Sequence, residues 1–198
     1  LSLLTGKSIP TGRYDIIFST DELENILGAH LGAFSAKAAM EGTAFYREKL
    51  GQVIGDSGLT IRDCPRLAEG FSYSEFDDEG HIRSDLGFVE KGSLKSFFHN
   101  SATARFFKTK NTAHAARGAK SSLGTSPTQL VIDVGKASKA DLYAGKVLKI
   151  ISLKGLHSGT NATSGHFSLA CEAVLYENNQ EMQVVKDVTL SGNFYELL

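Results

Sequence analysis

The chain has 198 residues, of which 41% are hydrophobic and 22% are charged, and its formal net charge is −1. This length suits one sizeable domain or two small ones, and the composition excludes a disordered chain and a coiled coil. A net charge so close to zero provides no general attraction to nucleic acid or to an anionic membrane.

The first predicted elements are a strand and a long helix. The apolar run Tyr14–Phe18 is short and rich in strand formers. Ser19 and Glu22 then have the spacing of a capping box, which predicts a helix start. We expect this helix to end near Gly42. Its apolar stripe consists of Leu23, Ile26, Leu27, Leu31, Phe34 and Ala38.

From Gly51 onward the pattern predicts mainly β-structure. The segment Glu90–Ser93 has the composition of a short hairpin loop, and Glu177–Gln180 that of a second turn. In the strand between 166 and 176 apolar and polar residues alternate, so Cys171 is expected to be a buried, unreactive thiol. The expected strands are 59–64, 82–89, 94–98, 130–134, 166–176, 182–185 and 188–190.

The predicted fold class is α+β: a mainly antiparallel β domain, sandwich or barrel-like, with the long N-terminal helix and one or two short helices. Phe106 and Phe107 are predicted to be core residues of a short helix that begins near Asn100 or Ser101. The segment Thr109–Ser126 shows no periodicity, and we expect a long exposed loop there.

The cysteines and the first residues of the chain allow predictions about the location of the protein and about a missing domain. Cys64 and Cys171 stand in no C-x-x-C spacing, so neither a disulfide framework nor a cysteine zinc site is expected. No apolar run approaches the roughly 20 residues of a membrane span, and no signal peptide is recognisable, so we expect a cytoplasmic protein without membrane association. Leu1 is not an initiator Met and the opening residues resemble a linker, so an N-terminal domain is expected to be missing.

A zinc-protease helix would hold two His ligands on one face with a Glu as general base. The predicted long helix has only His30 and no glutamate beside it, so His30 is expected to be a partly buried structural residue. We therefore expect no catalytic residue and no metal ligand in this chain. An independent hydrolase site assembled from distant loops stays open, with the candidates His157, His166, Asp77 and Asp78.

A loop rich in Gly, Ser, Thr and Asn precedes the clearest strand. Its glycines allow close backbone approach, and free amides and hydroxyls could bond an extended peptide, although an ordinary strand connection explains the composition equally well. Ser158 is not part of a G-x-S-x-G motif, so a serine hydrolase is not favoured. The candidate peptide-groove residues are Gly155, His157, Ser158, Gly159, Asn161, Gly165 and His166.

The stretch Lys91–Ile132 contains Lys and Arg residues but no Asp or Glu, which is locally typical of a nucleic-acid-binding surface. The nearly neutral chain as a whole argues against nucleic acid, and an acidic partner surface would suit the stretch equally well. The candidate anion or partner contacts are Arg105, Lys108, Lys110, Arg117 and Lys120.

Several segments together resemble the TldD/PmbA family, formerly described as modulators of DNA gyrase. The resemblance extends from about Ser8 to Leu198, and its specificity lies in the order and spacing of the segments. They are Gly42–Phe45, Lys49–Gly51, Phe76–Gly80, Lys91–Phe97, Gly155–Gly159, Gly165–Ser168 and Gly192–Asn193.

The TldD members resemble metalloproteases with an H-E-x-x-x-H helix, which would fall at about Leu27–Gly32, where this chain lacks those ligands. The resemblance therefore implies the C-terminal domain, residues 1–198, of the PmbA/TldE branch. Such a subunit would not be catalytic alone. It would form a groove for unfolded or modified peptides together with a TldD-type partner in the cytoplasm.

The resemblance also implies that zinc is held by the partner and that this chain has no cofactor of its own. A separate N-terminal α/β domain, absent from this chain, and a homodimer of the isolated chain are further expectations. The alternative function is a nucleic-acid or DNA-gyrase-associated binding module that uses the basic residues 91–132.

Overall fold

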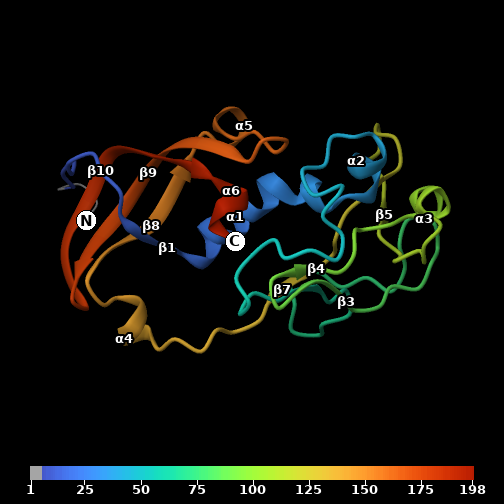
Figure 1. The fold of residues 1–198 in the computed structure, drawn as a ribbon, viewed down its shortest axis with the longest axis horizontal. Coiled ribbons are helices and arrows are strands. Elements are labelled where there is room, and N and C mark those ends of the chain that lie inside the picture. Colours follow the sequence, from blue (N-terminus) through green and yellow to red (C-terminus); the bar gives the residue numbers. More distant parts are fainter. Residues whose placement is uncertain (1–5) are drawn as a thin grey trace. The chain divides into compact units, whose positions relative to one another are not determined.

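The computed structural model describes residues 6–198, which group into two compact units (Figure 1). Unit 1 comprises residues 6–30, 136–161 and 165–194, and unit 2 comprises residues 31–135, 162–164 and 195–198. The first five residues of the predicted linker lie outside the described residues. None of the helices in residues 6–198 is long and apolar enough to cross a membrane.

Unit 1 is built on one four-stranded sheet with the order β1-β8-β9-β10. Strand β1 runs parallel to β8, whereas β8–β9 and β9–β10 are antiparallel pairs (Figure 1). Two short helices, α4 and α5, flank β8 along the chain. The bounds are β1 Asp15–Phe18, β8 Lys146–Lys154, β9 His166–Glu177, β10 Gln180–Asn193, α4 Lys139–Leu142 and α5 Leu156–Gly159.

The core of unit 1 lies between this sheet and helix α1 (Thr20–His30). Alternate residues of β9 are buried, as predicted: Phe167, Leu169, Cys171 and Ala173. Burial raises the pKa of the Cys171 thiol, which keeps it in the unreactive thiol form.

Strand β8 was not among the predicted strands, although it joins β1 to the rest of the sheet. Its apolar residues do not alternate strictly: the adjacent Val147 and Leu148 are both buried, and the register with β9 shifts between Ile150 and Ser152. A bulge of this kind inserts one extra residue and moves the side chains after it to the other face. The two predicted segments 182–185 and 188–190 form one strand, β10, with a similar shift between Val185 and Val188.

The prediction of a single long helix that ends near Gly42 is wrong. Helix α1 ends at His30 and is followed by the 3-10 turn η2 (Leu31–Phe34) and by the separate helix α2 (Ala36–Met40). Ser35 is extended and caps α2, since its hydroxyl accepts a hydrogen bond from the Ala38 amide at 3.2 Å. A serine that caps the next helix ends the previous one, and the apolar spacing alone does not reveal this.

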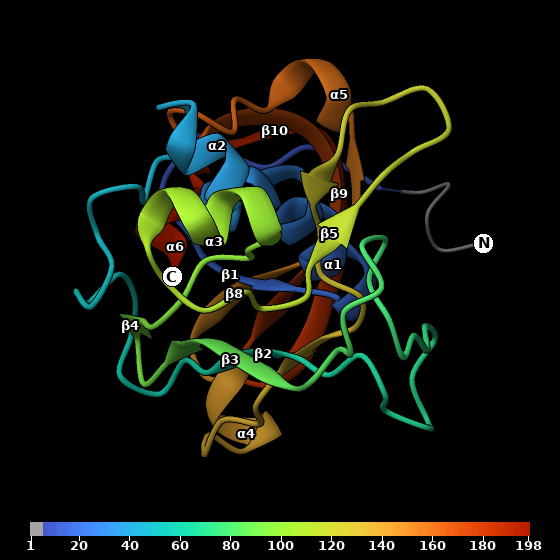
Figure 2. The ribbon, with the colours of Figure 1, turned by 90° about the vertical axis from the view of Figure 1, so that its right-hand side faces the viewer.

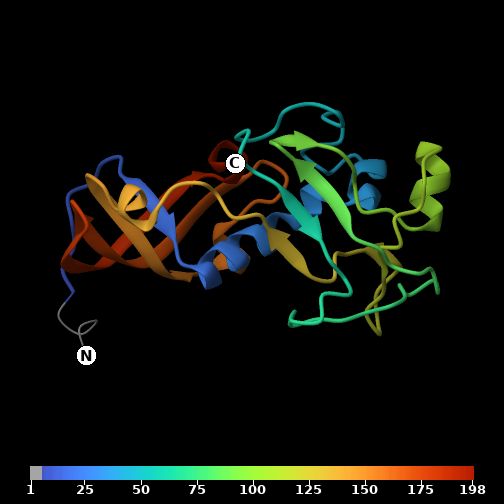
Figure 3. The same cartoon turned by 90° about the horizontal axis from the view of Figure 1, so that it is seen from below.

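Unit 2 contains a sheet with the order β4-β3-β2-β7 and a two-stranded ladder, β5-β6. Figure 2 shows β2 and β3 side by side, and Figure 3 shows β2 (teal) between β3 (green) and β7 (gold). All pairs in this unit are antiparallel. The bounds are β2 Ile61–Asp63, β3 Leu86–Glu90, β4 Ser93–Leu94, β5 Ala115–Ala116, β6 Gly124–Thr125, β7 Leu130–Ile132 and α3 Ser101–Phe107. A last short helix, α6, spans Phe194–Leu197.

The predicted hairpin between β3 and β4 is confirmed. Lys91 and Gly92 both have positive φ, 49° and 72°, as a tight two-residue turn between antiparallel strands requires. A Cβ atom on Gly92 would collide with the main-chain oxygens of Gly55 and Asp56. Glycine is therefore needed here both for its φ and for the close approach of the neighbouring chain.

The aromatic core of unit 2 includes Phe34, Phe88 and Phe98, with ring centroids 5.0 Å (Phe34–Phe88) and 4.7 Å (Phe88–Phe98) apart. The α+β class, with mostly antiparallel sheets and few helices, is confirmed. The predicted core role of Phe106 and Phe107 is wrong, because these side chains are 61% and 39% exposed.

Helix α3 begins at Ser101, as predicted, with Asn100 as its N-cap. With only seven residues, it turns Thr103 and Ala104 inward and Phe106 outward. The expectation of an exposed loop over Thr109–Ser126 is also wrong in part, since residues 113–115 are buried and residues 115–116 pair with 124–125 in the β5-β6 ladder.

Candidate functional site

Helix α1 and the turn after it contain the segment Leu27–Gly32, where an H-E-x-x-x-H motif was sought in the sequence. The one histidine of α1, His30, is fully buried, and its Nδ1 lies 2.8 Å from the Ile26 carbonyl oxygen. The ring stacks on Phe194 at a centroid distance of 4.4 Å. Burial lowers the pKa of His30, so the ring is held neutral. These contacts agree with a structural histidine, more deeply buried than predicted. Across residues 6–198, no group of three His, Cys, Asp or Glu side chains is arranged to hold a metal ion.

The predicted peptide-groove residues come together at one end of unit 1, around α5 and the start of β9. Gly155 precedes α5 with a φ of 84°, and its carbonyl oxygen accepts from the amides of Ser158 and Gly159. The Asn161 amide donates to His166 at 2.9 Å, and the Gly165 amide donates to Asn161 at 2.7 Å. These four amides are thus used within the loop. His157, Ser158, Asn161 and His166 are exposed.

The candidates for an independent hydrolase are divided. His157 and His166 belong to unit 1, whereas Asp77 and Asp78 belong to unit 2 and bind main-chain amides there. A different Ser–His pair lies in unit 2, where His81 Nε2 is 2.9 Å from Ser101 Oγ. Among the described residues no carboxylate contacts the other ring nitrogen of His81, so this pair does not complete a catalytic triad.

All five basic candidates are exposed and lie on α3 or on the chain that follows it. In the folded protein the basic stretch 91–132 lies next to acidic side chains, because three consecutive carboxylates of another loop accept hydrogen bonds from its main chain. Asp77 accepts from the Ala115 amide at 3.1 Å, Asp78 from the Arg117 amide at 2.6 Å and Glu79 from the Ser101 amide at 2.8 Å. A sequence window cannot reveal such long-range contacts. The five exposed residues are Arg105, Lys108, Lys110, Arg117 and Lys120.

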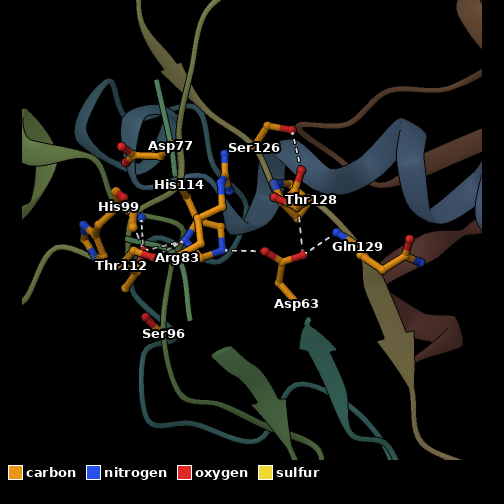
Figure 4. Close-up of polar contacts among 12 residues, drawn as sticks. Asp63, Asp77, Arg83, Ser96, His99, Thr112, His114, Ser126, Thr128 and Gln129 are labelled. Atoms are coloured by element: carbon orange, nitrogen blue, oxygen red, sulfur yellow. Dashed lines mark hydrogen bonds and ion pairs between the residues drawn. The ribbon is translucent and has the colours of Figure 1, made fainter. Parts of the chain in front are cut away.

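A buried polar network in unit 2 is the feature that the sequence analysis missed (Figure 4). Its centre is a close contact between Asp63, the last residue of β2, and His114, which are 0% and 1% exposed. His114 Nε2 lies 3.0 Å from Asp63 Oδ2. The other carboxylate oxygen, Oδ1, accepts hydrogen bonds from the amides of Thr128 at 2.9 Å and Gln129 at 2.6 Å.

The far side of the His114 ring faces Thr112. Nδ1 lies 2.7 Å from the Thr112 carbonyl oxygen and 3.0 Å from its hydroxyl, and the ring stacks on Phe98 at 4.9 Å. The residue types of this group, Thr, His and Asp, are those of a nucleophilic site. Asp63 and His114 are fully buried and Thr112 is partly buried, however, so the geometry favours a structural role over attack on a substrate.

His99 is the second histidine of the network. Its amide donates to the Thr112 hydroxyl at 2.7 Å, and its carbonyl oxygen accepts from the His114 amide at 3.0 Å. Burial, with a smaller contribution from nearby His114, lowers the pKa of His99 to about 4. His99 is therefore neutral near pH 7.

One cavity of about 580 Å³ lies in unit 1 and is lined by Gly12, Arg13, Tyr14, Asp15 and Lys146. None of the residues predicted for the peptide groove or the basic surface lines it. The Lys146 ammonium lies 5.7 Å from the centre of the Tyr14 ring, a cation–π contact at the surface. The cavity thus gives no support to either predicted site.

Comparison with known proteins identifies the family. A profile described as the PmbA/TldA metallopeptidase C-terminal domain matches residues 11–198. A metalloprotease of Methanothermobacter thermautotrophicus is 30% identical over 203 residues, which cover 99% of this chain and 43% of that protein.

Two solved structures agree with this match. A Thermotoga maritima protein, proposed to modulate a DNA gyrase, is 32% identical with a TM-score of 0.92, and the match covers 100% of this chain and 45% of that one. TldE from Thermococcus kodakarensis has the same fold, with 23% identity, a TM-score of 0.84 and coverage of 97% and 45%. The chain thus spans less than half the length of these relatives. The resemblance seen in the sequence is confirmed, and the chain belongs to the TldD/PmbA metallopeptidase family, whose C-terminal domain it matches.

Proposed function

We propose that this chain is the C-terminal domain of a non-catalytic, TldE/PmbA-like subunit that acts in the cytoplasm. Together with a zinc-bearing TldD-type partner it would form the groove of a peptide-degrading or peptide-maturing metalloprotease. The proposal is supported by the residues and contacts of α1 and the turn that follows it. In the segment expected for H-E-x-x-x-H, only His30 can bind a metal, and its ring is buried and bonded to Ile26.

The groove would lie at the end of unit 1 where the candidate residues gather. His166 at the start of β9 pairs with Asn193 at the end of β10, and β10 is the last strand in the sheet order. An extended peptide can add to the edge of a sheet through main-chain hydrogen bonds. Such binding depends little on side chains, which suits a subunit that handles unfolded or modified peptides.

Reconstitution tests the division of labour. A zinc-replete mixture of this chain with a TldD-type subunit should cleave an unfolded, fluorogenic polypeptide, whereas this chain alone should not. The partner with its two zinc-ligating histidines replaced is the matched control, and it should abolish cleavage in the mixture. Equal cleavage by this chain without any partner would rule the proposal out.

Main-chain recognition has its own test. Competing peptides with N-methyl groups on alternate amides should inhibit the reconstituted mixture poorly, because they lose hydrogen-bond donors. Peptides with exchanged side chains but an intact main chain should inhibit about equally. The reverse ranking would indicate side-chain pockets instead of strand addition.

A nucleic-acid-binding module remains the second candidate, and one observation favours it. Phe106 is 61% exposed on α3 next to Arg105 and close in sequence to Lys108 and Lys110, and exposed aromatic and basic side chains together suit single-stranded nucleic acid. If this function holds, affinity for DNA should fall steeply with added salt. No binding at low salt would exclude it.

A further inference from the structure

Besides His99, unit 2 buries four charged or chargeable side chains close together. Asp63, Asp77, Arg83 and His114 are 0%, 5%, 7% and 1% exposed. Asp77 and Arg83 both bind the residue after His114, because Asp77 accepts from the Ala115 amide and Arg83 Nη2 lies 3.5 Å from the Ala115 carbonyl oxygen. Burying an unbalanced charge is costly, so the protonation of this cluster matters for the fold.

The hydrogen-bond partners of His114 determine where its protons lie. The Thr112 carbonyl oxygen can only accept, and at 2.7 Å it is closer to Nδ1 than the Thr112 hydroxyl at 3.0 Å, so we assign a proton to Nδ1. Nε2 lies 3.0 Å from Asp63 Oδ2, within the range of an ion pair, but neither atom has a hydrogen-bond partner of good geometry. A neutral imidazole has one N–H, so a second proton, on Nε2, is what would give the ring a charge opposite to that of Asp63.

The charge balance of the cluster supports the same assignment. With that second proton on His114, the formal charges of two acidic side chains, Asp63 and Asp77, are balanced by those of Arg83 and His114. Without it the buried cluster would keep one uncompensated negative charge. His99 cannot supply the missing charge, because burial and the nearby His114 lower its pKa to about 4.

Asp63 also connects separate parts of the chain. From the end of β2 it holds His114, which precedes β5, and the amides of Thr128 and Gln129, which precede β7. The segment between these two attachment points carries Arg117 and Lys120, both exposed. One carboxylate thus holds both ends of the segment 114–129.

We propose that the Asp63–His114 pair is a charged lock, a buried imidazolium–carboxylate pair that holds the segment 114–129 on strand β2. Loss of the charge opens the lock and frees this segment, including the basic side chains at its surface. The lock is independent of the proposed protease role, because it involves no residue of α1, α5 or the β9–β10 edge.

The proton assignment is tested on the unaltered chain by nitrogen-15 NMR of the histidine rings at pH 7. Both ring nitrogens of His114 should have the chemical shifts of an imidazolium, each coupled to a proton. In Asp63→Asn the ring should carry one proton, on Nδ1, because the new amide can itself donate to Nε2. A singly protonated His114 ring in the unaltered chain would overturn the proposal.

Amide hydrogen exchange tests the holding of the segment. The amides of Ala115 and Ser126, which bond to Asp77 and His114, should exchange at least about tenfold faster in Asp63→Asn than in the unaltered chain. Glu172→Gln, which removes an exposed ion pair of unit 1, is the matched control and should leave both rates unchanged. Unchanged protection of β9 shows that unit 1 remains folded. Equal exchange of Ala115 and Ser126 in Asp63→Asn and the unaltered chain would overturn the lock.

Discussion

The two units are stabilised in different ways. The main strands of unit 1, β8, β9 and β10, are 9, 12 and 14 residues long and pair over most of their length. The strands of unit 2 have two to five residues each. Short ladders satisfy few main-chain groups, so the remaining groups of unit 2 need other partners.

Those partners are buried polar side chains. Of the buried polar or charged residues among those described, unit 1 contains only Glu22 and His30. A unit that depends on such residues should tolerate their loss poorly, because each truncation leaves a buried group unpaired. The buried polar residues of unit 2 are Asp63, Asp77, Arg83, His99, Asn100, Thr103 and His114.

The strongest contrast is expected between a fully buried acid, Asp63, and a partly exposed one, Glu172. Asp63→Ala should destabilise the protein by about 3–5 kcal/mol, because it leaves His114 and two amides without their partner. Glu172→Ala, which breaks the exposed pair with Lys154 in unit 1, should have a much smaller effect. Urea unfolding followed by circular dichroism measures both. Equal losses would show that unit 2 does not depend on its network.

The second-largest loss of stability is expected at Gly92, the glycine of the β3–β4 hairpin. Gly92→Ala should cost roughly 3 kcal/mol, since the added methyl group combines a left-handed conformation with a collision against Gly55 and Asp56. Gly155→Ala in unit 1 has a similar φ of 84° but its nearest atom is 3.9 Å away, so it should cost about 1 kcal/mol. Thermal unfolding distinguishes them, and a similar cost at both sites would contradict the collision argument.

Acid should weaken unit 2 through His99. Its pKa is about 4 in the folded state and about 6.5 in an unfolded chain, so the unfolded state binds the proton more readily. The stability contributed by neutral His99 is fully present above pH 6.5 and is lost as the pH falls toward 4. The loss should be roughly 1–3 kcal/mol.

His99→Gln is the variant that isolates this contribution, because it removes the titrating ring. Unfolding free energies measured from pH 7 to pH 4 should fall less steeply in this variant than in the unaltered chain. His30→Gln provides the comparison in unit 1, since burial lowers the pKa of His30 in the same direction. Identical pH profiles for His99→Gln and the unaltered chain would refute the assignment.

The smallest effect is expected at Phe106. Phe106→Ala should change the stability by less than about 0.5 kcal/mol, because the side chain is 61% exposed and fills no core space. Phe88→Ala, at a fully buried ring of the same unit, should cost about 3–5 kcal/mol. A large loss at Phe106 would restore the core role that the sequence analysis assigned to it.

The sequence predicted the elements whose signal is local. Three predictions depend on neighbouring residues alone, and each is found in the structure: the alternation in β9, the turn residues Lys91 and Gly92, and the start of α3 at Ser101. The break at Ser35 and the strand β8 were missed. The helix break depends on the Ser35 cap, and strand β8 contains a bulge. Each of these features interrupts the regular spacing of apolar residues from which helices and strands are predicted.

The candidate site, like the fold, could be predicted from the sequence only in part. The sequence by itself determined the absence of paired zinc ligands in α1 and the family resemblance, because both are properties of residue order. Only the tertiary structure decided that Asp63 meets His114 and that Asp77, Asp78 and Glu79 bind the basic segment. Contacts between residues that are distant in the chain arise from packing, and no local spacing encodes them.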